Sequence, residues 1–227
     1  MGFFIYFFLY PIFFLLKIIK FSNHFSKSSY ILFNMVEDKL IKYRKKRDFN
    51  VTPEPYTSEK ISKKARFVIQ KHEAMNLHYD LRLEVEGVLK SWAVPKGPSV
   101  DYTQKRLAIP TEDHPIDYID FEGTIPEGNY GAGTVIVWDT GTYRNLKEKH
   151  DHEIPMEKTI EDGRVEFILE GEKLKGAYAL IRTGKEGKKF WLFFKMKELH
   201  RDNRDILKEQ PESVLSGKTI EDLKKEQ

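Results

Sequence analysis

The sequence predicts a mainly β protein, folded as a small closed antiparallel barrel of about eight strands with short terminal helices. Three observations predict this fold class. Residues 77–85 alternate strictly between apolar and polar side chains, which is the period of two that a strand requires. About eight β-rich segments occur at close spacing between residues 60 and 197, with glycine-containing turns between them. Helical periodicity is almost absent from the same region, which indicates an all-β fold. A closed sandwich is the alternative architecture for the same set of strands.

The expected strands, in chain order, cover residues 66–70, 77–85, 88–94, 106–109, 134–139, 164–169, 176–182 and 190–197. Glu86-Gly87 lies between the second and third segments and predicts a hairpin turn. A short basic helix is expected at residues 35–46 and a weak helix at residues 219–225. Residues 48–58 contain two prolines and are expected to be extended.

The glycine-rich segment 126–133 could cradle a phosphate, but its surroundings predict turns and bulges instead. A phosphate-binding loop is followed by a helix and carries a Lys-Ser or Lys-Thr pair. Neither follows here, because residues 134–139 have the composition of a strand. The glycines are therefore expected to serve the backbone conformation of the loop.

Composition limits the chemistry that the chain can perform. The absence of cysteine excludes disulfides, zinc–thiolate sites and a cysteine nucleophile, so any metal must be held by His, Asp or Glu. The net charge of +3 comes from the first 34 residues, which contain Lys17, Lys20 and Lys27 and no acidic residue. The neutral remainder argues against a broad basic surface for nucleic acid, although it leaves room for a small basic pocket.

Composition also divides the chain into an apolar extension (1–34), an N-terminal arm (35–60), the barrel (61–200) and a polar tail or helix (201–227). The extension lacks the basic start and the cleavage site of a signal peptide. Its apolar run is short for a membrane span, because Lys17 interrupts it and Pro11 lies inside it. We favour Met35 as the true start; a membrane anchor is the alternative. In either case we expect the body of the protein to be cytoplasmic.

The alternating segment 77–85 places His78, Asp80 and Arg82 on its polar face. Neighbours on one face of a strand lie about 6.5–7 Å apart, so His78 and Asp80 could share one ion while Arg82 lies beside it. His72 could return as a third ligand if residues 73–76 form a turn. The ordinary interpretation is a solvated polar face. The alternative is a metal–phosphate site, because His and Asp ligate divalent cations and Arg binds phosphate in a fork.

Three protein ligands leave open positions on a divalent ion, which metal-assisted phosphoester cleavage requires. Arg82, Arg106 and Lys96 could then offset charge on the phosphoryl oxygens. His114 or Glu112 could position or transfer a proton. Without thiolates, Mn²⁺ or another divalent cation that accepts N/O ligands is expected. The other histidines are expected to be solvated: His24, His150, His152 and His200.

Several short motifs occur in order along the chain: KRDF at 46–49, TPEP at 52–55, FVIQKH at 67–72, LHYDLR at 77–82, SWAVPKGPS at 91–99, KRLA at 105–108, EDHP at 112–115, FEG at 121–123 and SVLSGKT at 213–219. Together they resemble the 3′-phosphoesterase module of bacterial DNA ligase D, a family that also has free-standing archaeal and bacterial members. The similarity spans roughly residues 40–220. Several motifs in order make it specific.

The resemblance implies a small β-barrel with an Mn²⁺ site on its hollow side. It also implies trimming of DNA or RNA 3′ ends, with removal of a terminal ribonucleoside as a phosphodiesterase and then of the 3′-phosphate as a phosphomonoesterase. By motif, His72, His78 and Asp80 would ligate the metal, while Arg82 and His114 would hold the scissile phosphate. The other implied residues line the site or belong to the N-terminal arm: Lys96, Arg106, Glu112, Tyr118, Arg47, Asp48 and Glu54.

The expected partners are DNA 3′ ends and RNA-tipped DNA 3′ ends. With 227 residues we expect no fused polymerase or ligase, so a DNA ligase and a primase-polymerase would act in trans. Two other functions stay open. One is a non-catalytic module that binds nucleic-acid ends and recruits a ligase, and the other is a membrane-tethered phosphoesterase that depends on residues 1–34. The complete ligand set favours the enzyme, since a pure binding module needs no metal with open positions.

Overall fold

The computed structural model describes residues 36, 39–58, 64–149, 152–183 and 190–226. The chain separates into two compact units, Met1–Lys39 and Leu40–Gln227. The predictions made for residues 1–34 lie outside the described residues, so the fold below is that of the second unit. Within the described part of the chain, no helix is both long enough and apolar enough to cross a membrane.

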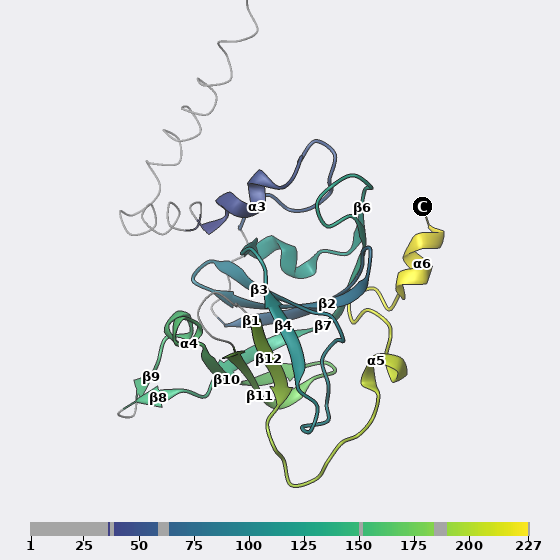
Figure 1. The fold of residues 1–227 in the computed structure, drawn as a ribbon. Coiled ribbons are helices and arrows are strands. Elements are labelled where there is room, and N and C mark those ends of the chain that lie inside the picture. The colour runs from purple at the N-terminus through teal and green to yellow at the C-terminus, as the bar shows by residue number, and fades with distance from the viewer. Residues whose placement is uncertain (1–35, 37–38, 59–63, 150–151, 184–189, 227) are drawn as a thin grey trace, which may run out of the picture. The chain divides into compact units, whose positions relative to one another are not determined.

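Eight strands of the described chain close into an antiparallel ring (Figure 1). Their order is β1-β2-β3-β4-β12-β11-β10-β7, and β7 pairs back with β1 to complete the ring. They are β1 Arg66–Glu73, β2 Leu77–Val85, β3 Val88–Val94, β4 Arg106–Pro110, β7 Gly133–Asn145, β10 Arg164–Gly171, β11 Lys175–Thr183 and β12 Phe190–Lys195. The predicted barrel of about eight strands is confirmed, and β7 is longer than its predicted segment.

The interior of the ring is an apolar core to which every one of these strands contributes. Phe67 and Ile69 of β1 and Leu81 and Leu83 of β2 point inward, since alternate residues of a strand face the same side. The β1–β7 register shifts between Ile69 and Gln70, where β7 contains one extra residue, Trp138. Such a bulge increases the local bend, which helps the sheet to close.

A second apolar group, here called the outer cluster, covers the opposite face of β1, β3 and β7. It consists of Tyr43, Val68, Leu89, Tyr118, Ile119, Phe121, Ile125, Val135 and Val137. Short elements bring these residues together: α3 (Ile41–Lys45), β5 (His114–Pro115), the 3₁₀ helix η1 (Ile116–Asp120) and β6 (Gly123–Ile125). The outer cluster packs against residues of the candidate site, which is described below.

The remaining elements lie outside the ring: β8 (Glu148–Lys149), β9 (His152–Glu153), α4 (Met156–Asp162), α5 (Ile206–Glu209) and α6 (Ile220–Lys225). The predicted C-terminal helix is confirmed as α6, and Thr219 caps it in a reciprocal capping box with Asp222. In the predicted helix 35–46, only Ile41–Lys45 form α3, while residues 35, 37 and 38 lie outside the described part. The sequence did not predict α4 or η1, which are too short to show helical periodicity.

Candidate metal centre and its buried surroundings

The β1–β2 hairpin brings the three predicted ligands together. His72 is directly paired with His78 across the two strands, and Asp80 follows on the same face two residues later. Residues 74–76 form the bend between the strands, as expected for the turn that returns His72 to the site. The two imidazole ring centres are 4.7 Å apart. The alternation along β2 and the short bend at residues 74–76 are therefore enough to bring the three side chains together.

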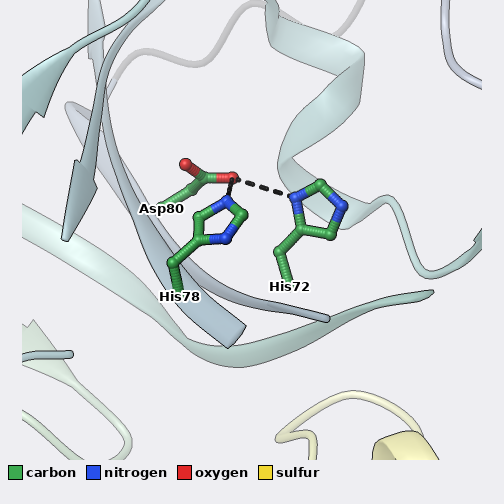
Figure 2. A group of neighbouring side chains, drawn as sticks. All are labelled: His72, His78 and Asp80. Atoms are coloured by element: carbon green, nitrogen blue, oxygen red, sulfur yellow. Dashed lines mark ion pairs between the residues drawn. The ribbon is translucent and has the colours of Figure 1, made fainter. Parts of the chain in front are cut away.

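One potential ligand atom from each side chain converges on a single point (Figure 2). The Asp80 Oδ2 atom lies 3.7 Å from His72 Nδ1 and 3.9 Å from His78 Nε2, and all three atoms lie within 4.8 Å of one another. Donors around one ion at about 2.0–2.2 Å lie at most about 4.4 Å apart. A small inward movement of the imidazoles therefore completes a coordination triangle.

Backbone carbonyls fix which nitrogen of each imidazole faces this point. The Nε2 atom of His72 lies 2.9 Å from the carbonyl oxygen of Gly131, and Nδ1 of His78 lies 2.9 Å from that of Asn76. A carbonyl oxygen only accepts, so in the neutral rings these nitrogens carry the proton. The lone pairs of His72 Nδ1 and His78 Nε2 are then directed to Asp80, which is the arrangement of metal-ligating histidines.

Asp80 supplies the negative charge of the donor set. Its side chain is buried, and Oδ2 accepts a hydrogen bond from Arg82 Nη2 at 3.0 Å. Burial acts to raise the pKa of Asp80, but the Arg82 guanidinium and the two imidazoles outweigh it and hold the pKa well below its usual range. Asp80 is consequently a carboxylate at neutral pH.

Arg82 was predicted to bind a phosphate. Most of the N–H groups of its guanidinium already contact other side chains of the protein. Its Nε donates to Gln70 Oε1 at 2.7 Å, and its Nη1 contacts Ser91 Oγ and His114 Nδ1, both at 2.9 Å. With the bond to Asp80, one N–H of Nη2 is left at the edge nearest the donor set. The orientation of Arg82 is therefore fixed by its neighbours before any substrate arrives.

His114 lies behind Arg82 rather than beside the donors. It is fully enclosed between Arg82 and Arg47, whose Nη2 is 3.4 Å from His114 Nε2, and its Nδ1 also lies 2.9 Å from the carbonyl oxygen of Glu112. Burial, followed by the two guanidiniums, lowers the pKa of His114 well below its ordinary value. The imidazole is neutral, so only one of its nitrogens can accept from an arginine while the other carries the proton. With Nδ1 donating to the Glu112 carbonyl, Nε2 is the acceptor that faces Arg47, and Arg82 packs against the Nδ1 side of the ring.

The N-terminal arm is joined to this network by ion pairs. Arg47 Nε is 2.8 Å from Glu54 Oε1 and its Nη1 is 3.1 Å from Glu112 Oε1. Lys46 Nζ is 2.9 Å from the other oxygen of Glu112. Tyr118 lies under the guanidinium of Arg82, 4.9 Å from its Cζ, within cation–π range. Four of the remaining predicted residues, Arg47, Glu54, Glu112 and Tyr118, thus surround Arg82 and His114.

Three other predicted residues lie elsewhere. Lys96 and Arg106 line a pocket that also contains Tyr79 and Asp205, and Tyr79 faces the barrel interior, away from Asp80. Asp48 is exposed, and its carboxylate accepts hydrogen bonds from Asn50. Their roles stay predictions, and the structure does not group them with the donor set.

Sequence reasoning missed several residues that shape the site, among them Ser91, Lys46, Gln70 and Gly131. Gln70 is fully buried, and its amide donates to the carbonyls of Tyr118 and Phe121 while accepting from Arg82. It shares strand parity with His72, which is a signal that could have found it. Gly131 holds His72 through its carbonyl oxygen. The prediction that the glycine loop serves the backbone is confirmed at Gly133, where φ is +139° and any Cβ would collide with the carbonyl of Glu73.

Fold and site together define a class of protein: a closed antiparallel β-barrel with a candidate N/O metal centre on the outer face of one hairpin. Residues 70–182 match the family model described as the DNA Ligase D 3′-phosphoesterase domain. The chain belongs to this family, as its motifs predicted. The matched range includes the complete donor set, together with Arg82 and His114.

Relatives with curated names agree with this assignment. The chain is 49% identical, over 189 residues, to the multifunctional non-homologous end joining protein LigD of Pseudomonas aeruginosa, covering 80% of this chain and 22% of that protein. It is 47% identical over 168 residues to the Mycolicibacterium smegmatis protein of the same name, covering 72% and 21%. The LigD of Mycobacterium tuberculosis is 46% identical over 164 residues, covering 71% and 20%. The chain thus spans about a fifth of the length of the curated relatives it matches.

Proposed function

We propose that this protein is a metal-dependent phosphoesterase that heals the 3′ ends of DNA, including DNA that ends in ribonucleotides. It removes a terminal ribonucleoside by phosphodiester cleavage and then removes the 3′-phosphate, which leaves a 3′-hydroxyl for repair. The observation that carries the proposal is the convergence of His72 Nδ1, His78 Nε2 and Asp80 Oδ2 in a chain of the 3′-phosphoesterase family.

The donor set fits a divalent cation such as Mn²⁺. Two neutral imidazole nitrogens and one carboxylate are ligands that such ions accept, and each imidazole is oriented by a backbone carbonyl. Bound there, the cation supplies Lewis acidity toward the phosphoester. His72, His78 and Asp80 would hold it through His72 Nδ1, His78 Nε2 and Asp80 Oδ2.

Arg82 is the residue that engages the phosphate. Its Nη2 lies 3.0 Å from Asp80, so its remaining N–H is next to the donor set and offsets negative charge that develops on a phosphoryl oxygen. Gln70, Ser91 and His114 hold the guanidinium in place, which removes the need to order a flexible side chain during the reaction. His114 therefore acts on the substrate through Arg82.

The names of the relatives, which place those proteins in non-homologous end joining, support a proposal for the cellular role. We propose that this chain prepares 3′ ends in the cytoplasm for a DNA ligase and a primase-polymerase that act in trans. A cleaned 3′-hydroxyl is the chemical requirement that both of those reactions share.

The test uses the full chain and a 5′-labelled DNA primer that ends in one ribonucleotide, with Mn²⁺, with Mg²⁺ or with EDTA. We expect a product with a 3′-phosphate, then one with a 3′-hydroxyl, only when a divalent cation is present. His78→Ala should abolish both steps, whereas His152→Ala, which removes an exposed histidine on β9, should change neither. A wild-type protein that binds the primer but never converts it would instead make the barrel an end-binding module.

A further inference from the structure

An aromatic side chain lies exposed beside the candidate metal centre, at the margin of the network described above. Tyr130 belongs to the glycine-rich loop, and nearly half of its surface, 47%, is accessible. The next residue, Gly131, contributes the carbonyl that fixes His72. Consecutive Cα atoms are about 3.8 Å apart, so the backbone of Tyr130 is tied to a metal ligand.

Lys46 connects Tyr130 to the other side of the site. The Lys46 Nζ atom donates to the Tyr130 hydroxyl at 2.9 Å and lies 4.1 Å from the centre of its ring. The same ammonium is bonded to Glu112, which is bonded to Arg47. Tyr130 is therefore anchored through both its backbone and its hydroxyl, although its ring is exposed.

The Lys46 ammonium and the Arg47 guanidinium lie over the Tyr130 ring, 4.1 Å and 5.4 Å from its centre. An exposed ring of fixed orientation with cations beside it has the properties of a base-stacking platform. Stacking between an aromatic side chain and a nucleobase tolerates every base, because each base has a π face. A nearby ammonium favours the phosphate that accompanies the base. Since the ring is already immobilised, stacking on it does not require further ordering of the side chain.

We propose that Tyr130, supported by Lys46, stacks against the nucleobase adjacent to the scissile phosphate and so positions the 3′ end over the donor set. This inference rests on the proposed function and names the group that recognises the nucleoside. It makes Tyr130 a positioning residue that acts through substrate binding, and it predicts recognition of a nucleobase without preference for its identity.

The main experiment compares wild type with Tyr130→Ala on the ribonucleotide-ended primer. We expect the KM to rise by about 10-fold while kcat changes little, because one base-stacking contact is lost. Tyr130→Phe and Tyr130→Trp keep a π face and should stay within about 3-fold of wild type by the same argument. Phe190→Ala removes an equally exposed aromatic, 42% accessible, from β12 and should have no effect.

A second substrate separates stacking from a structural role of the loop. On a primer whose terminal residues lack nucleobases, Tyr130→Ala and wild type should have the same KM. An equal loss on both substrates, or no loss on either, would overturn the proposal. Titration with Mn²⁺ alone should give the same affinity for both proteins, since the backbone carbonyl of Gly131 is retained.

A binding measurement keeps the inference independent of catalysis. A primer that carries 2-aminopurine as its terminal base, mixed with the protein in EDTA, should lose fluorescence on stacking in wild type and keep it in Tyr130→Ala. An inactive wild type that quenches the probe would refute the proposed function and leave the platform standing. A wild type that cleaves the primer without this quenching difference would refute the platform alone.

Discussion

Strand β2 buries both of its faces, and the two faces differ in what covers them. On the inner face, Leu81 and Leu83 are surrounded by apolar side chains from the whole ring. On the outer face, Asp80 and Arg82 are only 5% and 3% exposed, yet they are covered by other polar groups and by aromatic rings. The same nine-residue strand thus separates an apolar core from a buried network of charges.

The difference indicates that the inner face mainly contributes stability, whereas the outer face carries the candidate site. Apolar burial is favourable without specific partners, whereas a buried charge is tolerated only when its partners are in place. Each polar residue on the outer face is correspondingly bonded to at least one other. Function therefore depends on a few contacts there, while the inner face tolerates changes that keep its volume.

The largest effect is expected from Asp80→Ala, which should abolish metal binding and cleavage. It also leaves the buried Arg82 guanidinium without its carboxylate, a loss of about 3–5 kcal/mol in the free energy of unfolding. Calorimetric titration with Mn²⁺ and denaturant unfolding measure the two effects. Asp80→Asn keeps the shape of the side chain and should be less destabilising while still losing affinity. Wild-type turnover in Asp80→Ala would refute the ligand assignment.

Leu81→Ala, at the neighbouring position of the same strand, should lower stability without changing metal binding. The cavity left in the barrel core should lower the free energy of unfolding by about 2–5 kcal/mol. Affinity for Mn²⁺, measured well below the unfolding temperature, should stay within about 2-fold of wild type because the donor set is untouched. A large loss of affinity in this variant would show that the two faces are not independent.

A moderate effect is expected from pH through His114. Its pKa is lowered in the folded protein, so below about pH 6.5 the unfolded state binds a proton that the folded state refuses. Stability should therefore fall as pH decreases below that value, by up to about 1.4 kcal/mol per pH unit. The groups that face His114 are Arg82, Asp80, Arg47, Glu112, Tyr43 and Tyr118.

Denaturant unfolding of wild type and His114→Gln between pH 5 and pH 7.5, in EDTA, isolates this contribution. Glutamine can still accept from an arginine but does not titrate, so the stability difference between the two proteins should narrow as pH falls. A difference that is constant over the whole range would contradict the buried neutral imidazole.

The smallest effect is expected from Lys46→Ala at the margin of the network. The Lys46 side chain is 40% exposed, so its ion pair with Glu112 is partly screened and should contribute less than about 1 kcal/mol to the free energy of unfolding. Glu112 keeps Arg47 as a partner in this variant. Unfolding experiments should give a small difference at low salt and a smaller one at high salt, because salt screens an exposed pair. A loss above about 2 kcal/mol that persists at high salt would place Lys46 in the buried part of the network.

Sequence reasoning reached the ring and the donor set because both depend on local patterns. The alternation in 77–85 set the parity of β2, and that parity placed His78 and Asp80 on one face. The return of His72 needed only a short bend. The choice between a solvated and a functional polar face could not be made from alternation alone, since both give the same pattern. The structure excludes a solvated face at Asp80 and Arg82, because both are buried, and the metal–phosphate role of the face stays a prediction.

What the sequence could not reveal depends on contacts between distant segments. Nothing local to Gly131 indicates that its carbonyl will meet His72, 59 positions away. Arg82 of β2 contacts Gln70, Ser91 and His114, which lie on β1, β3 and β5. These contacts form only when the four strands are assembled. Lys96 and Arg106 were assigned to the site by charge and by motif, and neither tells which groups a side chain will meet; both line a pocket with Tyr79 and Asp205, and their roles stay predictions.

The closure of the barrel affects how readily the β1–β2 hairpin opens locally. β1 is hydrogen-bonded to β2 and β7, and β2 to β1 and β3, so neither strand has a free edge from which to fray. The backbone amides of both strands should exchange with solvent only when the whole ring opens. The N-terminal arm is joined to Glu112 and His114 through the side chains of Lys46 and Arg47, and it can open without breaking the ring. The donor positions on β1 and β2 are thus expected to exchange slowly, beside an arm that is expected to exchange faster.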